Sequence, residues 1–186
     1  MKQRIIIIGG MGPQASLELH RRMIQQTLAD GAKDGTDFPH IVHLSLPVPD
    51  FIANESRRSE ALEIIINELK NIDASMGDVI IIACNTAHLL QPDIEQRLNI
   101  RITSMVDAAI DYVSRHYKTI PQAALDKIPI TTQYEQANAV NYINNYPSSP
   151  PVLLGCTELS CAFAEKPNTI DPMNILLRYL TTKGVL

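Results

Sequence analysis

The sequence predicts an α/β protein with two pseudo-symmetric lobes, in which parallel sheets are flanked by helices. Two apolar runs, residues 5–8 and 79–83, are continuous rather than alternating. Such runs are typical of strands that helices cover on both faces. Each run is followed by small or polar residues and then by helical periodicity, so strands and helices alternate along the chain. This alternation indicates parallel strands joined by right-handed crossovers.

The first half of the chain supplies most of these elements. Residues 9–13, Gly-Gly-Met-Gly-Pro, turn the first strand into a helix, and Pro13 suits the first helical turn. Pro47 ends the second strand. In order, the predicted elements are strand 5–8, helix 14–29, strand 40–46, a helix from near Ser56, strand 79–83, a helix from near Ala87 and strand 100–103.

The second half repeats part of this pattern. Residues 152–157 parallel residues 80–85, because both are short apolar strands that deliver a cysteine to the start of a helix. Asp171 is predicted as the N-cap of the last helix, with Pro172 at its first position. We therefore expect a first lobe over residues 1–103 and a second over 104–186, with the C-terminal helix packing back on the first lobe. The second lobe is truncated, because residues 118–150 contain one plausible helix but no Gly-rich turn.

Composition excludes several classes of function. The 186 residues include 16 basic and 20 acidic side chains, a net charge of −4, and only 5% aromatic residues. No basic run is available to neutralise phosphates, so we expect no nucleic-acid partner. The apolar runs are far shorter than the roughly 20 residues that cross a bilayer, and the N-terminus does not resemble a signal peptide. We expect a cytoplasmic protein without a membrane partner.

Three cysteines do not form a disulfide framework, so their placement needs another explanation. Cys84 and Cys156 both lie where a strand passes into a helix, where free N–H groups favour the thiolate. A thiolate base opposed to a thiol acid can remove an α-proton from one face of an amino acid and return a proton to the other. This pair predicts racemisation or epimerisation. The alternative is packing, the usual role of a buried cysteine, which we assign to Cys161.

Three motifs together resemble a known family. Residues 9–13, residues 83–88 (Ala-Cys-Asn-Thr-Ala-His) and residues 155–159 (Gly-Cys-Thr-Glu-Leu) are similar to the signatures of the aspartate/glutamate racemases, especially the aspartate racemases. The resemblance covers residues 4–115 and resumes from 152 to 180. It implies an enzyme without pyridoxal phosphate, metal or other cofactor that interconverts L- and D-aspartate or glutamate. Its substrate would be a small acidic amino acid.

The resemblance also assigns roles to residues. The acid/base thiols would be Cys84 and Cys156, and the substrate carboxylate would lie against Asn85, Thr86 and Thr157. The backbone of Met11 and Gly12 would line the pocket. Each role has a structural alternative: the glycines can serve only the turn, and Asn85 and Thr86 can serve only as caps. Glu158 would meet the substrate ammonium or complement a helix dipole, and His88 would tune Cys84 or be a half-exposed helix residue.

Two departures from the family pattern define the competing hypotheses. Aspartate-selective members tend to carry an arginine after the Pro-Asp of the second-strand loop, but Phe51 follows Asp50 here, and Arg57 and Arg58 come later. The segment that would supply a substrate-facing lysine is missing, and Lys166 is no clear substitute. The leading alternative is a trimmed paralogue that binds a small carboxylate without turnover.

Other hypotheses are a related reaction on a carboxylic acid, such as decarboxylation, and a metal held by Cys84 and His88.

A lobe without its first strand leaves apolar surface and a sheet edge uncovered. We therefore expect a homodimer.

Overall fold

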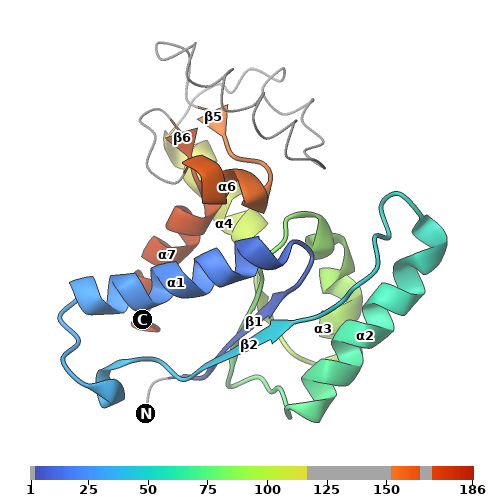
Figure 1. Cartoon of the computed structure of the whole chain (residues 1–186), viewed down its shortest axis with the longest axis horizontal. Helices are drawn as coiled ribbons and strands as arrows, with labels where there is room; N and C mark the ends of the chain where they lie inside the picture. The colour runs from blue at the N-terminus through green and yellow to red at the C-terminus, as the bar shows by residue number, and fades with distance from the viewer. Residues whose placement is uncertain (1–2, 117–151, 164–168) are drawn as a thin grey trace.

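The computed structural model describes residues 3–116, 152–163 and 169–186. Its main sheet has four parallel strands in the order β2-β1-β3-β4, with helices on both faces (Figure 1). The predicted α/β class, with a parallel sheet flanked by helices, is confirmed. The strands are β1 (Ile5–Gly9), β2 (Ile41–Ser45), β3 (Val79–Ile82) and β4 (Ile102–Thr103).

The helices follow the predicted order with two local differences. The segments near Ser56 and Ala87 begin as 3-10 turns, η2 (Glu55–Arg57) and η3 (Thr86–Leu90), before an α-helix continues. Pro92 explains the second case, because proline lacks an N–H and is tolerated only in the first helical turn. The remaining elements are α1 (Pro13–Ala29), η1 (Gly35–Asp37), α2 (Arg58–Asn71), α3 (Gln91–Leu98), α4 (Met105–His116), α6 (Thr157–Phe163) and α7 (Pro172–Thr182).

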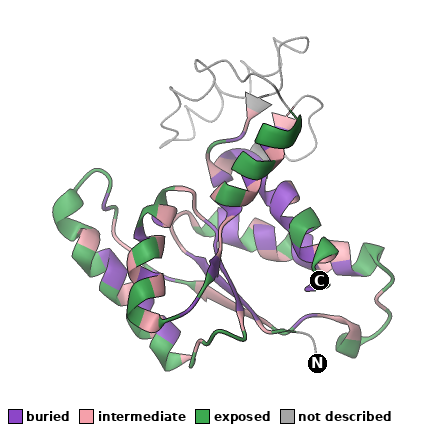
Figure 2. Cartoon of the chain, turned by 180° about the vertical axis from the view of Figure 1, so that it is seen from behind, coloured by how far each residue is buried: buried purple, intermediate pink, exposed green. Residues whose placement is uncertain are grey.

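The central strands divide their side chains between two apolar cores. In β1, Ile6 and Ile8 face a core shared with α2, η3 and α3, whereas Ile5 and Ile7 face a core shared with α1 and α7. All four isoleucines are fully buried, as Figure 2 shows for the central strands. Burial of both faces explains why the run is continuously apolar rather than alternating.

A smaller unit is built from the second half of the chain. β5 (Val152–Leu153) pairs in parallel with β6 (Thr169–Ile170), and Ile170 packs with Ala109 and Val113 of α4. Met173, Leu176 and other side chains of α7 enter the core of the main sheet. The division into lobes at residues 103 and 104 stays a prediction. Residues 118–150 and Lys166 lie outside the described residues.

Within the described ranges, none of the helices is long and apolar enough to span a bilayer.

A buried arginine joins the two halves of the molecule. Arg22 of α1 is only 6% exposed, and its guanidinium contacts acceptors on three helices. It donates to Glu18 Oε1 at 2.7 Å, to Asp171 Oδ2 at 2.6 Å and to the Ser160 carbonyl at 2.6 Å. Since a buried charge is tolerated only when it is paired and hydrogen-bonded, these contacts fix α6 and α7 against α1.

Asp171 serves several partners in this network. Its side chain accepts the backbone N–H of Met173, as the predicted N-cap does, and Pro172 occupies the first turn of α7. The same carboxylate accepts the Ser160 hydroxyl at 2.7 Å. One buried side chain therefore starts α7 and also holds α6.

Arg22→Met should destabilise the protein by about 3–5 kcal/mol, because it leaves Asp171 buried without its cation. Urea unfolding followed by circular dichroism measures this change. Arg57→Met is the control, since Arg57 pairs with Glu60 on an exposed surface and should shift the midpoint little. Equal shifts in the two variants would show that the buried network does not hold the fold together.

Glu18 gives this network a pH dependence. Hydrogen bonds from Arg21 first, and also from Arg22, lower the pKa of Glu18 to about 2. A carboxylate with a depressed folded-state pKa stabilises the fold fully above its ordinary pKa of about 4.5, and loses that contribution as the pH falls towards 2.

Glu18→Gln should therefore lower stability by about 1.5 kcal/mol near pH 6, and the gap to wild type should close as the pH approaches 2. Thermal melts over this pH range measure the gap. Glu55→Gln removes an exposed carboxylate and serves as the control. A gap for Glu18→Gln that stays constant with pH would contradict the assignment.

Candidate active site

The Gly-rich turn and Cys84 lie at the same edge of the main sheet. They follow β1 and β3, which are neighbouring parallel strands and therefore end side by side. In the order β2-β1-β3, β2 is added on one side of β1 and β3 on the other, so the strand order reverses at β1 and β3. Ligands of such sheets bind outside the carboxyl ends of the strands at this point. The topology thus predicts a site between residues 9–12 and Cys84.

Gly10 is required by the turn itself. Its φ is +100°, and a Cβ at this position would lie 2.1 Å from the Leu46 carbonyl oxygen, which follows β2. Backbone from β1 and β2 therefore meets here without room for a side chain. This glycine serves the turn, one of the two roles that the sequence left open.

Cys84 is half-buried, and its environment acts on the thiol in two directions. Burial is the main cause that raises its pKa, and the charge of Glu158 adds to the rise. Backbone N–H groups of Ala87 and Thr86 hydrogen-bond the sulfur and oppose the rise. These N–H groups belong to η3, but burial outweighs them, so the pKa of Cys84 is raised and the thiolate is not favoured overall as its sequence context predicted.

A hydrogen bond between distant segments brings the second cysteine to this edge. Asn85, next to Cys84, donates its Nδ2 to the Gly155 carbonyl at 2.6 Å. Cys156 is the next residue, and it directly precedes α6. The charge of Cys84 contributes to the pKa of Cys156, so the two thiols lie within electrostatic reach of each other. The fold therefore gathers both predicted thiols at one edge.

Cys156 contacts a carboxylate directly. Its Sγ donates to Glu158 Oε2 at 2.6 Å. Burial first, and then this hydrogen bond, raise the pKa of Cys156 to about 12. Cys156 is therefore a thiol at neutral pH.

Glu158 also packs against the Gly-rich turn. Gly12 has a φ of +35°, and a Cβ at this position would lie 2.1 Å from Glu158 Oε1. The missing side chain of Gly12 thus makes room for the Glu158 carboxylate, which lies between the turn after β1 and Cys156. This contact joins three of the predicted site residues.

The other predicted substrate-binding residues differ in exposure. Thr157 is buried, with its hydroxyl 3.5 Å from Glu158 Oε2, whereas Thr86 is exposed and offers its backbone N–H to Cys84. Met11 is half-buried against the core of β1 and β3.

The packing role assigned to Cys161 is wrong, because Cys161 is exposed on α6. Leu159 and Ser160 of the same helix are buried, so the apolar stretch did not show which of its side chains face the core.

The second-strand loop and its arginines are engaged elsewhere. Asp50 accepts the backbone N–H groups of Ile52 and Ala53, and Phe51 is buried. Arg57 pairs with Glu60, while Arg58 pairs with Asp93 and donates to the Leu89 carbonyl. These partners hold both guanidinium groups.

His88 supports the backbone near Cys84. Its Nδ1 lies 2.8 Å from the Cys84 carbonyl oxygen, and burial lowers its pKa. Its Nε2 is buried and finds no hydrogen-bond partner among the described residues. Among residues 3–116, 152–163 and 169–186, no group of three or more His, Cys, Asp or Glu side chains is placed to hold a metal ion.

Two contacts at this edge could not be located from the sequence. The Asn85–Gly155 hydrogen bond joins segments 70 positions apart and has no local signal. The Cys156–Glu158 contact has a weak signal, because the two residues are separated by one position at the start of a helix.

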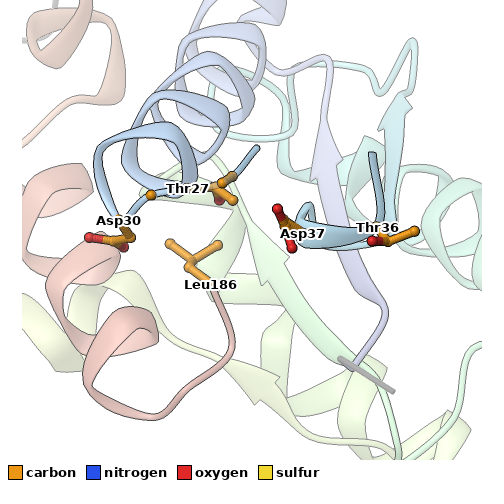
Figure 3. Close-up of a pocket in the computed structure, with 7 residues that line it drawn as sticks. Thr27, Asp30, Thr36, Asp37 and Leu186 are labelled. Carbon is orange, nitrogen blue, oxygen red and sulfur yellow. The ribbon is translucent and has the colours of Figure 1, made fainter. Parts of the chain in front are cut away.

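A separate pocket lies at the other end of α1 (Figure 3). It encloses about 310 Å³, and it is lined by Thr27, Asp30, Gly31, Ala32, Thr36, Asp37 and Leu186. None of the predicted site residues lines it. The chemistry of the two thiols is therefore remote from this pocket.

Comparisons with known proteins agree with the fold. The chain is 28% identical over 129 residues to the broad specificity amino-acid racemase RacX of Bacillus subtilis (strain 168). The aligned region covers 68% of this chain and 53% of that protein. The chain thus spans about half the length of this curated relative.

Solved structures with a similar fold include an aspartate racemase homologue from Pyrococcus horikoshii OT3, with a TM-score of 0.67, 20% identity and full coverage of both chains. Another is the Picrophilus torridus aspartate racemase, with a TM-score of 0.57 and 20% identity over 98% of this chain and 94% of that one.

The fold and the site together define a parallel α/β protein with two cysteines at the carboxyl edge of its sheet. The model of the Asp/Glu/hydantoin racemase family matches residues 8–132, more than half of the chain. The chain belongs to this family.

Gly12→Ala should destabilise the protein by about 1–2 kcal/mol and displace the Glu158 carboxylate, because the new methyl group needs its space. It should also change the alkylation rate of Cys156. Gly31→Ala is the matched control, since Gly31 has a φ of +100° but open space around it. Urea unfolding and iodoacetamide labelling measure the two effects. An unchanged Cys156 rate in Gly12→Ala would contradict the contact.

Proposed function

We propose that this protein is a cofactor-independent amino-acid racemase that interconverts L- and D-aspartate, or glutamate. Of Cys84 and Cys156, one would remove the α-proton of the substrate and the other would donate a proton to the opposite face. The observation that supports the proposal best is the hydrogen bond that joins the segments of the two thiols at one edge of the sheet. Cys84 comes from the end of β3 and Cys156 from the start of α6, and the Asn85–Gly155 hydrogen bond holds their segments together.

The environment of the thiols suits proton abstraction from carbon. Burial raises the pKa of both Cys84 and Cys156. A thiolate with a raised pKa is a stronger base, and the paired thiol remains protonated as an acid. In the proposed reaction, one thiolate takes the α-proton and the opposite thiol donates its proton to the other face. The two sulfurs supply both the base and the acid, so the scheme needs no cofactor.

Substrate binding is proposed for the groups around the thiols. The proposed groups are the backbone of Met11 and Gly12, which lie in the turn that contacts Glu158, the side chain of Asn85 and the backbone N–H groups of η3. Asn85 Oδ1 is buried without a partner among the described residues, so it can accept a hydrogen bond from an ammonium group. The substrate range is best tested broadly, because the matched Bacillus relative is described as having broad specificity.

The second candidate function is binding of a small carboxylate without turnover. It is favoured by residues 118–150, in which the sequence offers one plausible helix but no Gly-rich turn like that of residues 9–13. Both candidates predict a ligand at the thiols, but only the racemase predicts exchange of the α-proton with solvent.

The homodimer expected from the sequence stays a prediction, which sedimentation or light scattering can test.

The deciding experiment incubates the purified protein with single enantiomers in deuterated water. The panel covers aspartate, glutamate and representative neutral and basic amino acids, and both α-proton exchange and chirality are followed. Cys84→Ala and Cys156→Ala should each lower racemisation by about 10³-fold or more, because each removes one of the two acid/base groups. Each variant should exchange the α-proton of one enantiomer at most.

Cys161→Ala is the matched control, since Cys161 is an exposed thiol on the same helix as the motif. It should leave racemisation unchanged. Absence of exchange with every amino acid, together with binding of a small carboxylate, would reject the racemase in favour of the second candidate.

A further inference from the structure

The carboxylate of Glu158 occupies an unequal position between the two thiols. Its Oε2 accepts a hydrogen bond from Cys156 Sγ at 2.6 Å, and its Oε1 lies in the space that a side chain at Gly12 would fill. Its charge also acts on Cys84, but without a direct hydrogen bond between the two side chains. Cys156 therefore contacts the negative charge of Glu158 directly, whereas Cys84 is affected by that charge only through space.

The charged groups of the neighbouring helices do not cancel this effect. Glu18 and Arg22 of α1 and Asp171 at the start of α7 bond one another in the buried network. Their charges act on Cys161. The charges that act on Cys156 come from Glu158 and from Cys84. After burial, the hydrogen bond to Glu158 is therefore the largest influence that raises the pKa of Cys156.

The backbone reinforces the difference between the thiols. Cys84 receives two backbone N–H groups, from Thr86 and Ala87, which stabilise a thiolate. Cys156 receives the backbone N–H of Glu158, but it also donates to the Glu158 carboxylate. Ionisation of Cys156 would replace this hydrogen bond with a contact between two negative groups, which is unfavourable.

We propose that Glu158 is a positioning residue that holds the proton on Cys156, so that Cys156 rests as the acid and Cys84 ionises first as the base. The proposal deepens the racemase function and rests on it for its catalytic meaning. Each turnover that begins in this state moves the substrate α-proton to the Cys84 thiolate, while Cys156 gives its own proton to the opposite face.

The resting state must then be restored. After such a turnover Cys84 is a thiol and Cys156 is a thiolate beside the Glu158 carboxylate. Release of one proton from Cys84 to water and uptake of one proton from water by Cys156 balance the cycle. Repulsion between the thiolate and the carboxylate favours this uptake.

The test measures the reactivity of each thiol without relying on turnover. Wild type, Glu158→Gln and Glu158→Asp are labelled with iodoacetamide between pH 6 and 11, and each cysteine is quantified by peptide mass spectrometry. Glu55→Gln is the control, because it removes an exposed acidic residue that also lies in the first turn of a short helix. Circular dichroism confirms that each variant is folded.

The Gln variant keeps the shape of Glu158 but removes its charge. We expect the labelling rate of Cys156 at pH 8 to rise about tenfold, since loss of a contacting carboxylate lowers a thiol pKa by about one unit or more. Cys84 should change by less than about threefold, because it only senses the charge. Glu158→Asp keeps the charge on a shorter side chain and should fall between wild type and Glu158→Gln.

Two outcomes would overturn the proposal. One is an unchanged Cys156 rate in Glu158→Gln, which would mean that Glu158 fills space without holding the proton. The other is an equal rise at Cys84 and Cys156, which would mean a general opening of the site. If Glu158→Gln does not fold, the ratio of the Cys156 and Cys84 rates in Glu158→Asp decides by the same criteria.

A second measurement links the proton to catalysis. With an accepted substrate, Glu158→Gln should shift the pH profile of kcat to lower pH in the direction where Cys156 is the base. A purely structural role would lower kcat without moving the profile. If the wild type exchanges no α-proton, the racemase function fails, whereas the labelling experiment still decides whether Glu158 holds the Cys156 proton.

Discussion

The buried guanidinium of Arg22 is the constraint on which the arrangement of this protein depends. A charge that is almost fully removed from water must be paired, and besides Glu18 on α1 the partners of Arg22 include Asp171 at the start of α7 and the Ser160 carbonyl of α6. Asp171 and the Ser160 carbonyl therefore draw α7 and α6 against α1. Because Cys156 directly precedes α6, this network also determines where the second thiol lies. The position of Cys156 thus depends on a cation that is not part of the thiol site.

The thiol site combines low polarity with one fixed negative charge. Burial disfavours the thiolate at both cysteines, which makes each thiolate a stronger base when it forms. Glu158 then makes the environments of the two sulfurs unequal, because it accepts a hydrogen bond from Cys156 but acts on Cys84 only through its charge. Gly12 permits this arrangement by leaving space for the carboxylate. Membership of the Asp/Glu/hydantoin racemase family and the proposed proton transfer are consistent with such a pair.

Local patterns predicted much of the fold because they report burial and capping. The isoleucines of β1 indicated a strand covered on both faces, and Asp171 with Pro172 marked the start of α7. The same reasoning failed for Cys161, since an apolar stretch in a short helix does not reveal which neighbour covers it. It also placed the helix after Cys84 one turn too early, because Pro92 delays the α-helix behind a 3-10 turn.

The sequence by itself determined the strands and helices, the parallel class of the sheet and the two cysteines at strand ends, because each depends on residues close together in the chain. Only the tertiary structure decided which side chains contact one another across the molecule. Arg22 and Asp171 are 149 positions apart, and Asn85 and Gly155 are 70 apart. Such pairs leave no periodic signal, since their partners are chosen by the packing of whole helices. The approach of the segments that carry Cys84 and Cys156 is therefore a consequence of the fold.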